Sequence, residues 1–148
     1  MRDPAVIAKI LRRQKARRSQ RVGADAQGVV AQRLIAMGFK QVCPIEVGWV
    51  KVRGRWIRGK KVAGDFRAVG PGGRSVLVEA KYRSESVLTW SMVKPHQRRA
   101  LDVHHAAGGM SLLAWACPQG VQILLWPVEG FGPRKSLSGA DANLGEVG

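Results

Sequence analysis

The order of the apolar runs in the second half of the sequence constrains the fold most. A strand-like run at 74–82, RSVLVEAKY, precedes a helical stretch, PHQRRALDVHHAAGG, which opens on a proline and ends at a glycine stop. Two short, strongly apolar runs follow, SLLAWAC and VQILLWPV, joined at PQG. Because the helical stretch lies between strands, this half of the chain predicts a mixed sheet with helices on its faces.

The first half adds a helix and two further strands. Residues 24–37 place apolar side chains at helical spacing, and Gly38 follows where a C-terminal cap belongs. The run 41–52 reads as a strand broken at a proline, 54–62 as a polar hairpin or loop, and 63–69 as a strand that ends at the turn GPGG. We therefore expect an α/β fold whose mixed central sheet has about five strands flanked by helices.

The charge balance indicates a polyanionic partner. The chain has 148 residues, with 25 Lys and Arg against 10 Asp and Glu, for a net charge of +15. A field of that sign favours nucleic acid, since binding releases its counterions. Residues 1–22 are expected to form a basic N-terminal arm, partly helical or ordered only on binding. Residues 23–128 are expected to form one domain, and the glycine-rich residues 129–148 a flexible tail.

Other features exclude a membrane or secreted protein and predict a cytoplasmic one. No apolar stretch approaches the roughly 20 residues that span a bilayer, and no secretory apolar segment follows the first methionine. Cys43 and Cys117 are isolated, without the spacing of a disulfide framework or a zinc site. The short, basic, single-domain form is typical of a phage or microbial protein.

Two carboxylates and a lysine form the candidate catalytic group. In the run VLVEAKY the valines alternate with Glu79 and Lys81, which therefore project together from the other face of the strand. If the strands on either side of GPGG pair as a hairpin, Asp65 and Glu79 lie at a similar level. Two acids brought together in a basic protein favour a hard divalent cation between them, such as Mg²⁺ or Mn²⁺. Lys81 would then lie beside the attacking water, as phosphodiester hydrolysis requires.

These residues and their order resemble the PD-(D/E)xK nuclease superfamily. The resemblance rests on GDF, the glycine-rich turn, VLVEAKY, the helix opening KPHQRRAL and the apolar strand after it. It covers roughly residues 20–127 and is strongest with Holliday junction resolvases of the RecU and archaeal Hjc kind. It implies a restriction-endonuclease-like fold, in which Asp65, Glu79 and the backbone carbonyl of Ala80 ligate metal and Lys81 is the catalytic lysine. Gln97 would contact a water on the metal or the scissile phosphate.

The chain departs from the family pattern at one position. The family places a glutamate in the first helix, a few residues after a glycine, and that register gives Gly23 and then Gln27. An amide contributes no charge to a metal site. Asp25 is the nearest acid, but it lies about 200° around the helix from Gln27 and faces another direction. Either a second metal binds weakly, or a changed position 27 reduces activity.

The resemblance predicts a Mg²⁺-dependent endonuclease that resolves four-way DNA junctions, acting as a homodimer because paired nicks need two sites related by two-fold symmetry. Two alternatives stay open: another nuclease of the superfamily, of repair or restriction type, and a non-catalytic DNA-binding module on the same fold. Trp56 and Trp90 lie in polar segments, and we expect them either to stack on unpaired bases or to pack across a subunit interface. Phosphate contacts are expected from basic residues of the arm and the strands, namely Arg12, Arg13, Lys15, Arg17, Arg18, Arg21, Lys60, Lys61 and Arg83.

Overall fold

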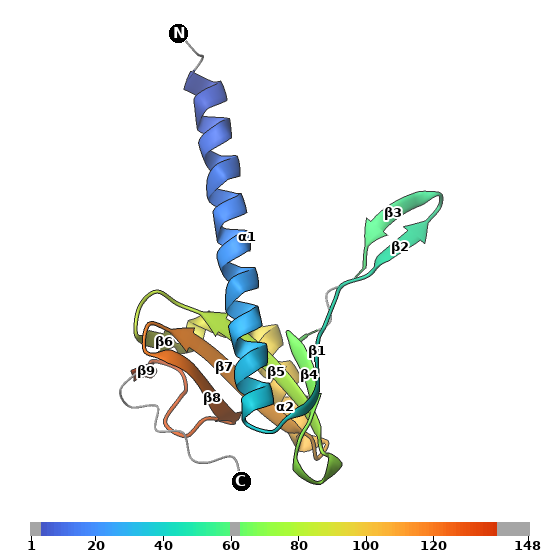
Figure 1. Cartoon of the computed structure of the whole chain (residues 1–148), viewed down its shortest axis with the longest axis vertical. Coiled ribbons are helices and arrows are strands. Elements are labelled where there is room, and N and C mark those ends of the chain that lie inside the picture. Colours follow the sequence, from blue (N-terminus) through green and yellow to red (C-terminus); the bar gives the residue numbers. More distant parts are fainter. Residues whose placement is uncertain (1–3, 60–62, 139–148) are drawn as a thin grey trace.

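The computed structural model describes residues 4–59 and 63–138, and it arranges most of them as a central sheet between two helices (Figure 1). The helices are α1 (Pro4–Ala36) and α2 (Pro95–Ala106), and 3-10 turns lie at Pro71–Gly73 and Trp90–Met92. The strands, in chain order, are β1 (Lys40–Pro44), β2 (Trp49–Val52), β3 (Arg55–Arg58), β4 (Phe66–Val69), β5 (Ser75–Tyr82), β6 (Val87–Thr89), β7 (Met110–Cys117), β8 (Gly120–Trp126) and β9 (Ser136–Ser138).

The central sheet has five strands in the order β1-β4-β5-β7-β8. Strands β5 and β7 run parallel, joined by the crossover that contains α2, and every other neighbouring pair in this sheet is antiparallel. The predicted mixed sheet of about five strands is therefore confirmed, and so is the hairpin of β4 and β5 about GPGG.

Each face of the sheet carries a buried apolar layer. Val30 and Leu34 of α1 pack over one face, and Leu101 of α2 packs over the other. Strand β5 divides its side chains between them, because neighbours on a strand point to opposite faces. Val76 and Val78 join the α1 layer, whereas Leu77 joins the α2 layer. Glu79 and Lys81 continue the series of Leu77, so the two charged side chains start from the α2 face.

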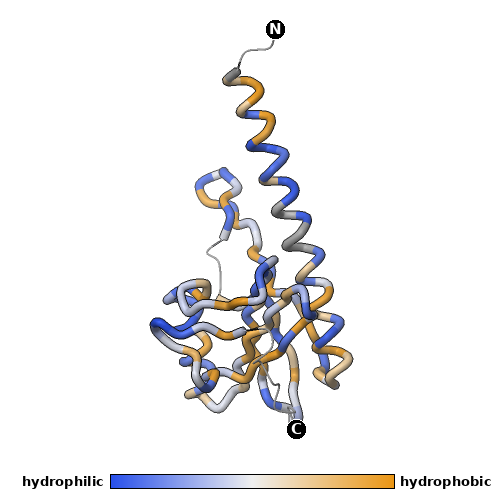
Figure 2. The backbone as a smooth tube through the Cα atoms, turned by 90° about the vertical axis from the view of Figure 1, so that its left-hand side faces the viewer, coloured by the Kyte–Doolittle hydropathy of each residue, from blue (hydrophilic) through white to orange (hydrophobic). Residues whose placement is uncertain are grey.

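Helix α1 is longer than the sequence predicted. It runs unbroken from Pro4 to Ala36, so the boundary expected at residue 22 falls inside a helix. Its first half is rich in Ala, Arg, Lys and Gln, which favour helix without tertiary contacts. That half projects from the body with its side chains from Ala5 to Arg18 exposed (Figure 1), apolar in its first turns and hydrophilic in the next (Figure 2). Among the described residues, no helix combines the length and apolar character needed to cross a bilayer.

The start of the expected flexible tail is part of the fold. Phe131 is buried, with its ring 5.2 Å from that of Trp90, and β9 pairs with β6. Trp90 also stacks on Trp126, with ring centroids 5.7 Å apart. The prediction that Trp90 meets bases or a subunit interface was wrong, because this apolar cluster takes up its ring. The remainder of the tail, 139–148, lies outside the described residues.

Strands β2 and β3 form a two-stranded hairpin that projects from the body (Figure 1). All eight of their residues are exposed. Cross-strand pairing puts Trp49 opposite Arg58 and Lys51 opposite Trp56, so these four side chains share one face. The Lys51 ammonium lies 6.0 Å from the centre of the Trp56 ring. The hairpin therefore presents a face that is both aromatic and cationic.

Candidate active site

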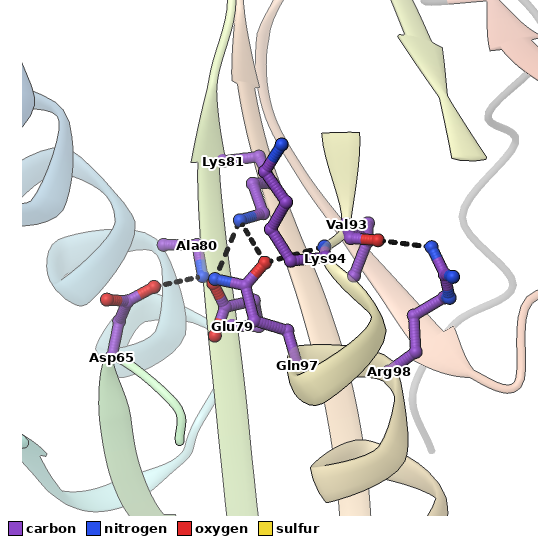
Figure 3. Close-up of polar contacts among 8 residues, drawn as sticks. All are labelled: Asp65, Glu79, Ala80, Lys81, Val93, Lys94, Gln97 and Arg98. Carbon is purple, nitrogen blue, oxygen red and sulfur yellow. Dashed lines mark hydrogen bonds and ion pairs between the residues drawn. The ribbon is translucent and has the colours of Figure 1, made fainter. Parts of the chain in front are cut away.

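The β4–β5 hairpin brings Asp65 beside the ladder of β5. Phe66 pairs with Val78, and the Asp65 amide donates to the Val78 carbonyl at 2.8 Å. The Asp65 side chain then turns toward the next residues of β5, where its Oδ2 accepts the Ala80 amide at 2.8 Å (Figure 3). Since the N–H and C=O of one strand residue point to the same edge, the Ala80 carbonyl also points toward Asp65. This is the arrangement that the hairpin prediction required.

Gly64 sets the direction in which the chain enters this position. Its φ is +95°, which glycine adopts without strain, and a Cβ there would lie 2.5 Å from Leu77 Cδ1. The residue before Asp65 therefore has to be small and left-handed for the carboxylate to reach Ala80.

Glu79, Lys81 and Gln97 form one buried polar cluster on the α2 side (Figure 3). The Lys81 ammonium lies 3.0 Å from Glu79 Oε1 and donates to Gln97 Oε1 at 2.7 Å. Gln97 Nε2 donates to the same Glu79 oxygen. The Glu79 and Lys81 side chains are only 4% and 14% exposed, so the charges attract each other in surroundings that screen them weakly.

The start of α2 fixes Gln97. Pro95 occupies the first turn, where a missing N–H costs nothing, and the Lys94 amide donates to Gln97 Oε1 at 2.8 Å. Gln97 is buried, and its amide thus links the helix terminus to both charged side chains of β5. The sequence predicted Gln97 beside the site, and the structure places it in direct contact with Glu79 and Lys81.

A cavity of about 130 Å³ opens between α1 and the end of the hairpin. Gln27 lines it together with Asp65, Ala80 and Lys81. Asp25 instead lines the neighbouring hollow, as the helical angle between positions 25 and 27 predicted. The exposed amide of Gln27 therefore faces the same cavity as Asp65 and Lys81.

The oxygen atoms at this site are of the type that a hard divalent cation binds, namely carboxylate and backbone carbonyl oxygens. Asp65 retains Oδ1 beside the oxygen bound to Ala80, and the Glu79 carboxylate and Ala80 carbonyl come from the adjacent strand. Within the described ranges, no three His, Cys, Asp or Glu side chains gather as a metal-binding group. Asp65 and Glu79 thus provide two carboxylates. Asp65 lines the cavity together with Gln27, whereas Glu79 lies in the cluster with Lys81 and Gln97.

The predicted phosphate-binding residues have different surroundings. The basic side chains described on α1 are exposed, whereas Lys60 and Lys61 lie outside the described residues. Arg83 is half-buried just after β5, and its Nε has no hydrogen-bond partner within the part of the chain that the structure describes.

Sequence reasoning missed a basic hollow on the α2 side. It measures about 450 Å³ and brings Arg67 of β4 to Arg99 and His96 of α2, over an apolar floor that includes Leu77. The sequence did contain one indication of it. Arg67 lies two residues after Asp65, and Arg99 lies two residues after Gln97, so both cations are close in sequence to the candidate site. Strand and helix have to be packed together before these cations can be seen to converge.

Comparison with known proteins bears on the fold. No protein-family model and no curated protein sequence matches the chain. Among solved structures, the chain is similar to Hjc of Archaeoglobus fulgidus, a Holliday junction resolvase from an archaeal hyperthermophile. The two share 16% sequence identity with a TM-score of 0.55, over 80% of this chain and 90% of that one. The likeness that the sequence motifs predicted is therefore present in three dimensions: the chain has the restriction-endonuclease-like α/β fold of an archaeal junction resolvase.

Proposed function

We propose that this protein is a Mg²⁺-dependent endonuclease that resolves four-way DNA junctions by paired nicks. One observation carries the proposal. In a fold shared with a Holliday junction resolvase, Asp65 accepts the Ala80 amide of β5, and Glu79 and Lys81 of the same strand form a polar cluster with Gln97 of α2. Acids, a lysine and an amide at one strand end are the groups that phosphodiester hydrolysis needs.

In this mechanism, Asp65, Glu79 and the Ala80 carbonyl would hold the cation. Mg²⁺, with Mn²⁺ as a substitute, supplies Lewis-acid polarisation of the phosphate when bound. Lys81 directs its ammonium toward the attacking water and offsets the negative charge that grows on the phosphate oxygens. Gln97 holds that ammonium through the 2.7 Å bond to its carbonyl, so the lysine is oriented before DNA arrives.

DNA binding follows from the charge of the chain. The exposed cations of α1 and Arg83 would contact phosphates, which position a substrate without reading its sequence. A four-way junction is two-fold symmetric, and a homodimer presents two sites related by the same symmetry. Selection of junctions over duplex would then come from the spacing of the two sites.

A DNA-binding module without catalysis is the second candidate, and the site itself favours it in one respect. Gln27 lines the cavity where a third acid would strengthen the hold on a cation. Glu79 also has Lys81 and Gln97 as partners in the absence of metal, so the cluster is satisfied as an ordinary polar core. Another nuclease of the superfamily would have the same site and differ only in its preferred DNA shape.

The test is cleavage of a labelled four-way junction and a matched duplex, in Mg²⁺ and in EDTA. We expect symmetric nicks in the junction that need Mg²⁺ and disappear in Lys81→Ala and Glu79→Gln. Glu85→Gln is the matched control, because this acid is exposed in the loop after β5. Tight binding of the junction with no cleavage by the parent or by Gln27→Glu would instead leave the binding module. Equal cleavage of junction and duplex would favour the other nuclease class.

A further inference from the structure

The hollow that Asp25 lines is next to the 130 Å³ cavity of Asp65 and Lys81, which is called the site cavity from here on. It measures about 330 Å³ and lies between α1 and the turn that joins β7 to β8. Ala26 and Tyr82 line both hollows, so the second begins where the first ends. A phosphate held beside Lys81 in the site cavity would therefore have this space next to it.

The walls of the hollow are apolar except at one point. Val29 of α1 and Val121 of β8 face it with Cys117, and Tyr82 adds an aromatic ring that is half exposed. In a single-stranded nucleic acid, the flat apolar part next to a phosphate is its base, and bases stack on aromatic side chains. A hollow of this lining suits a base better than it suits a phosphate.

Asp25 is the charged residue that lines the hollow, and its negative charge bears on which part of a nucleotide can bind there. A carboxylate at the rim repels phosphate, whereas the surrounding protein carries a net charge of +15. An ionised carboxylate only accepts hydrogen bonds, and the exocyclic amino group of cytosine is a donor that acids read in DNA. Thymine presents a carbonyl oxygen at the same position and would be disfavoured.

From these observations we infer that the hollow receives one unpaired base next to the phosphate in the site cavity. Tyr82 stacks on this base, and Asp25 selects a base with an amino group, cytosine over thymine. The inference rests on the proposed function, since it takes the site cavity to hold the scissile phosphate. Bases at a branch point open at the lowest cost, which supplies the unpaired nucleotide.

The test measures binding by fluorescence anisotropy in EDTA, where cleavage is excluded. Junctions carry cytosine, thymine or an abasic residue at each nucleotide beside the branch point in turn. At one position, we expect the abasic residue to weaken binding by the parent at least about fivefold, and thymine to weaken it by a similar factor. Tyr82→Ala should abolish both differences, and Tyr82→Phe should keep them. Asp25→Asn should lose the preference for cytosine over thymine and keep the abasic penalty, whereas the exposed-acid control Glu85→Gln should change neither.

Two results would overturn the inference. The first is that every nucleotide change in the junction alters the affinity of the parent and of Tyr82→Ala by the same factor. The other is a uniform loss of binding in Tyr82→Ala, which would indicate a contact with a second copy or with the backbone. Cleavage in Mg²⁺ separates this inference from the proposed function. Cleavage without a base effect refutes the base site alone, and a base effect without cleavage refutes the nuclease alone.

Discussion

Replacing Lys81 by methionine tests how much the buried pair of Glu79 and Lys81 contributes to the stability of the fold. The substitution keeps most of the side-chain stem and removes the ammonium. Two interactions disappear with it, the 3.0 Å contact with Glu79 and the 2.7 Å hydrogen bond to Gln97. Glu79 then keeps the Gln97 amide but loses the Lys81 ammonium.

The size of the expected stability loss follows from the burial of the Glu79 side chain. The Glu79 side chain is 4% exposed, so water cannot replace the lost cation. Breaking a buried pair by removing one partner costs about 3–5 kcal/mol, and the remaining Gln97 donor keeps the value near ~3 kcal/mol. For a chain of this length, that loss corresponds to a melting temperature lower by roughly 10 °C.

Urea unfolding followed by circular dichroism measures the difference, with thermal melts as a second readout. In the double variant Lys81→Met, Glu79→Gln, the buried carboxylate that loses Lys81 is no longer charged, so we expect more than half of the lost stability to return. Mg²⁺ should stabilise Lys81→Met more than the parent, because the cation replaces the missing positive charge beside Glu79. A Lys81→Met protein as stable as the parent, with no added effect of Mg²⁺, would refute this reasoning.

Three further changes test other parts of the molecule. Gln27→Glu adds a carboxylate to the site cavity and should tighten Mn²⁺ binding about tenfold, or ~1.4 kcal/mol, by calorimetry; unchanged affinity would separate position 27 from the site. Arg99→Gln should lower the slope of log affinity against log salt by about 0.9, the value for one phosphate contact; an unchanged slope would exclude the α2-side hollow from the DNA path. Trp56→Ala should weaken binding to a junction by about fivefold and to duplex much less, since stacking needs open bases; equal losses on both would contradict a stacking role.

The hairpin that carries the site was predictable because local patterns determine it. Alternation in VLVEAKY gives the strand, GPGG gives the turn, and together they set the register that brings Asp65 to the level of β5. The helix start at Pro95 was equally local. The five strands followed from these runs and the crossover between them.

Contacts between distant elements were not predictable in the same way. The amide of Gln97 binds both Glu79 and Lys81 only because α2 packs on β5 at one particular rotation. Phe131 reads as a lone aromatic in a glycine-rich tail, and its burial depends on the ring of Trp90. The continuity of α1 was missed because the first 22 residues have only a thin apolar face, whereas their Ala, Arg, Lys and Gln favour helix without one.

The projecting half of α1 has a further consequence for the energetics of DNA binding. Seven cationic side chains lie between Lys9 and Arg21, and several face each other three or four residues apart, as Arg13 and Arg17 do. Such like-charge neighbours disfavour the helix, and no packed body offsets this cost along the exposed turns. In the proposed complex with DNA, phosphates would neutralise the repulsion, which would link the helix–coil equilibrium of this segment to its affinity for DNA. Salt and DNA should both raise its helicity, and part of the free energy of that proposed binding would offset the ordering of the segment.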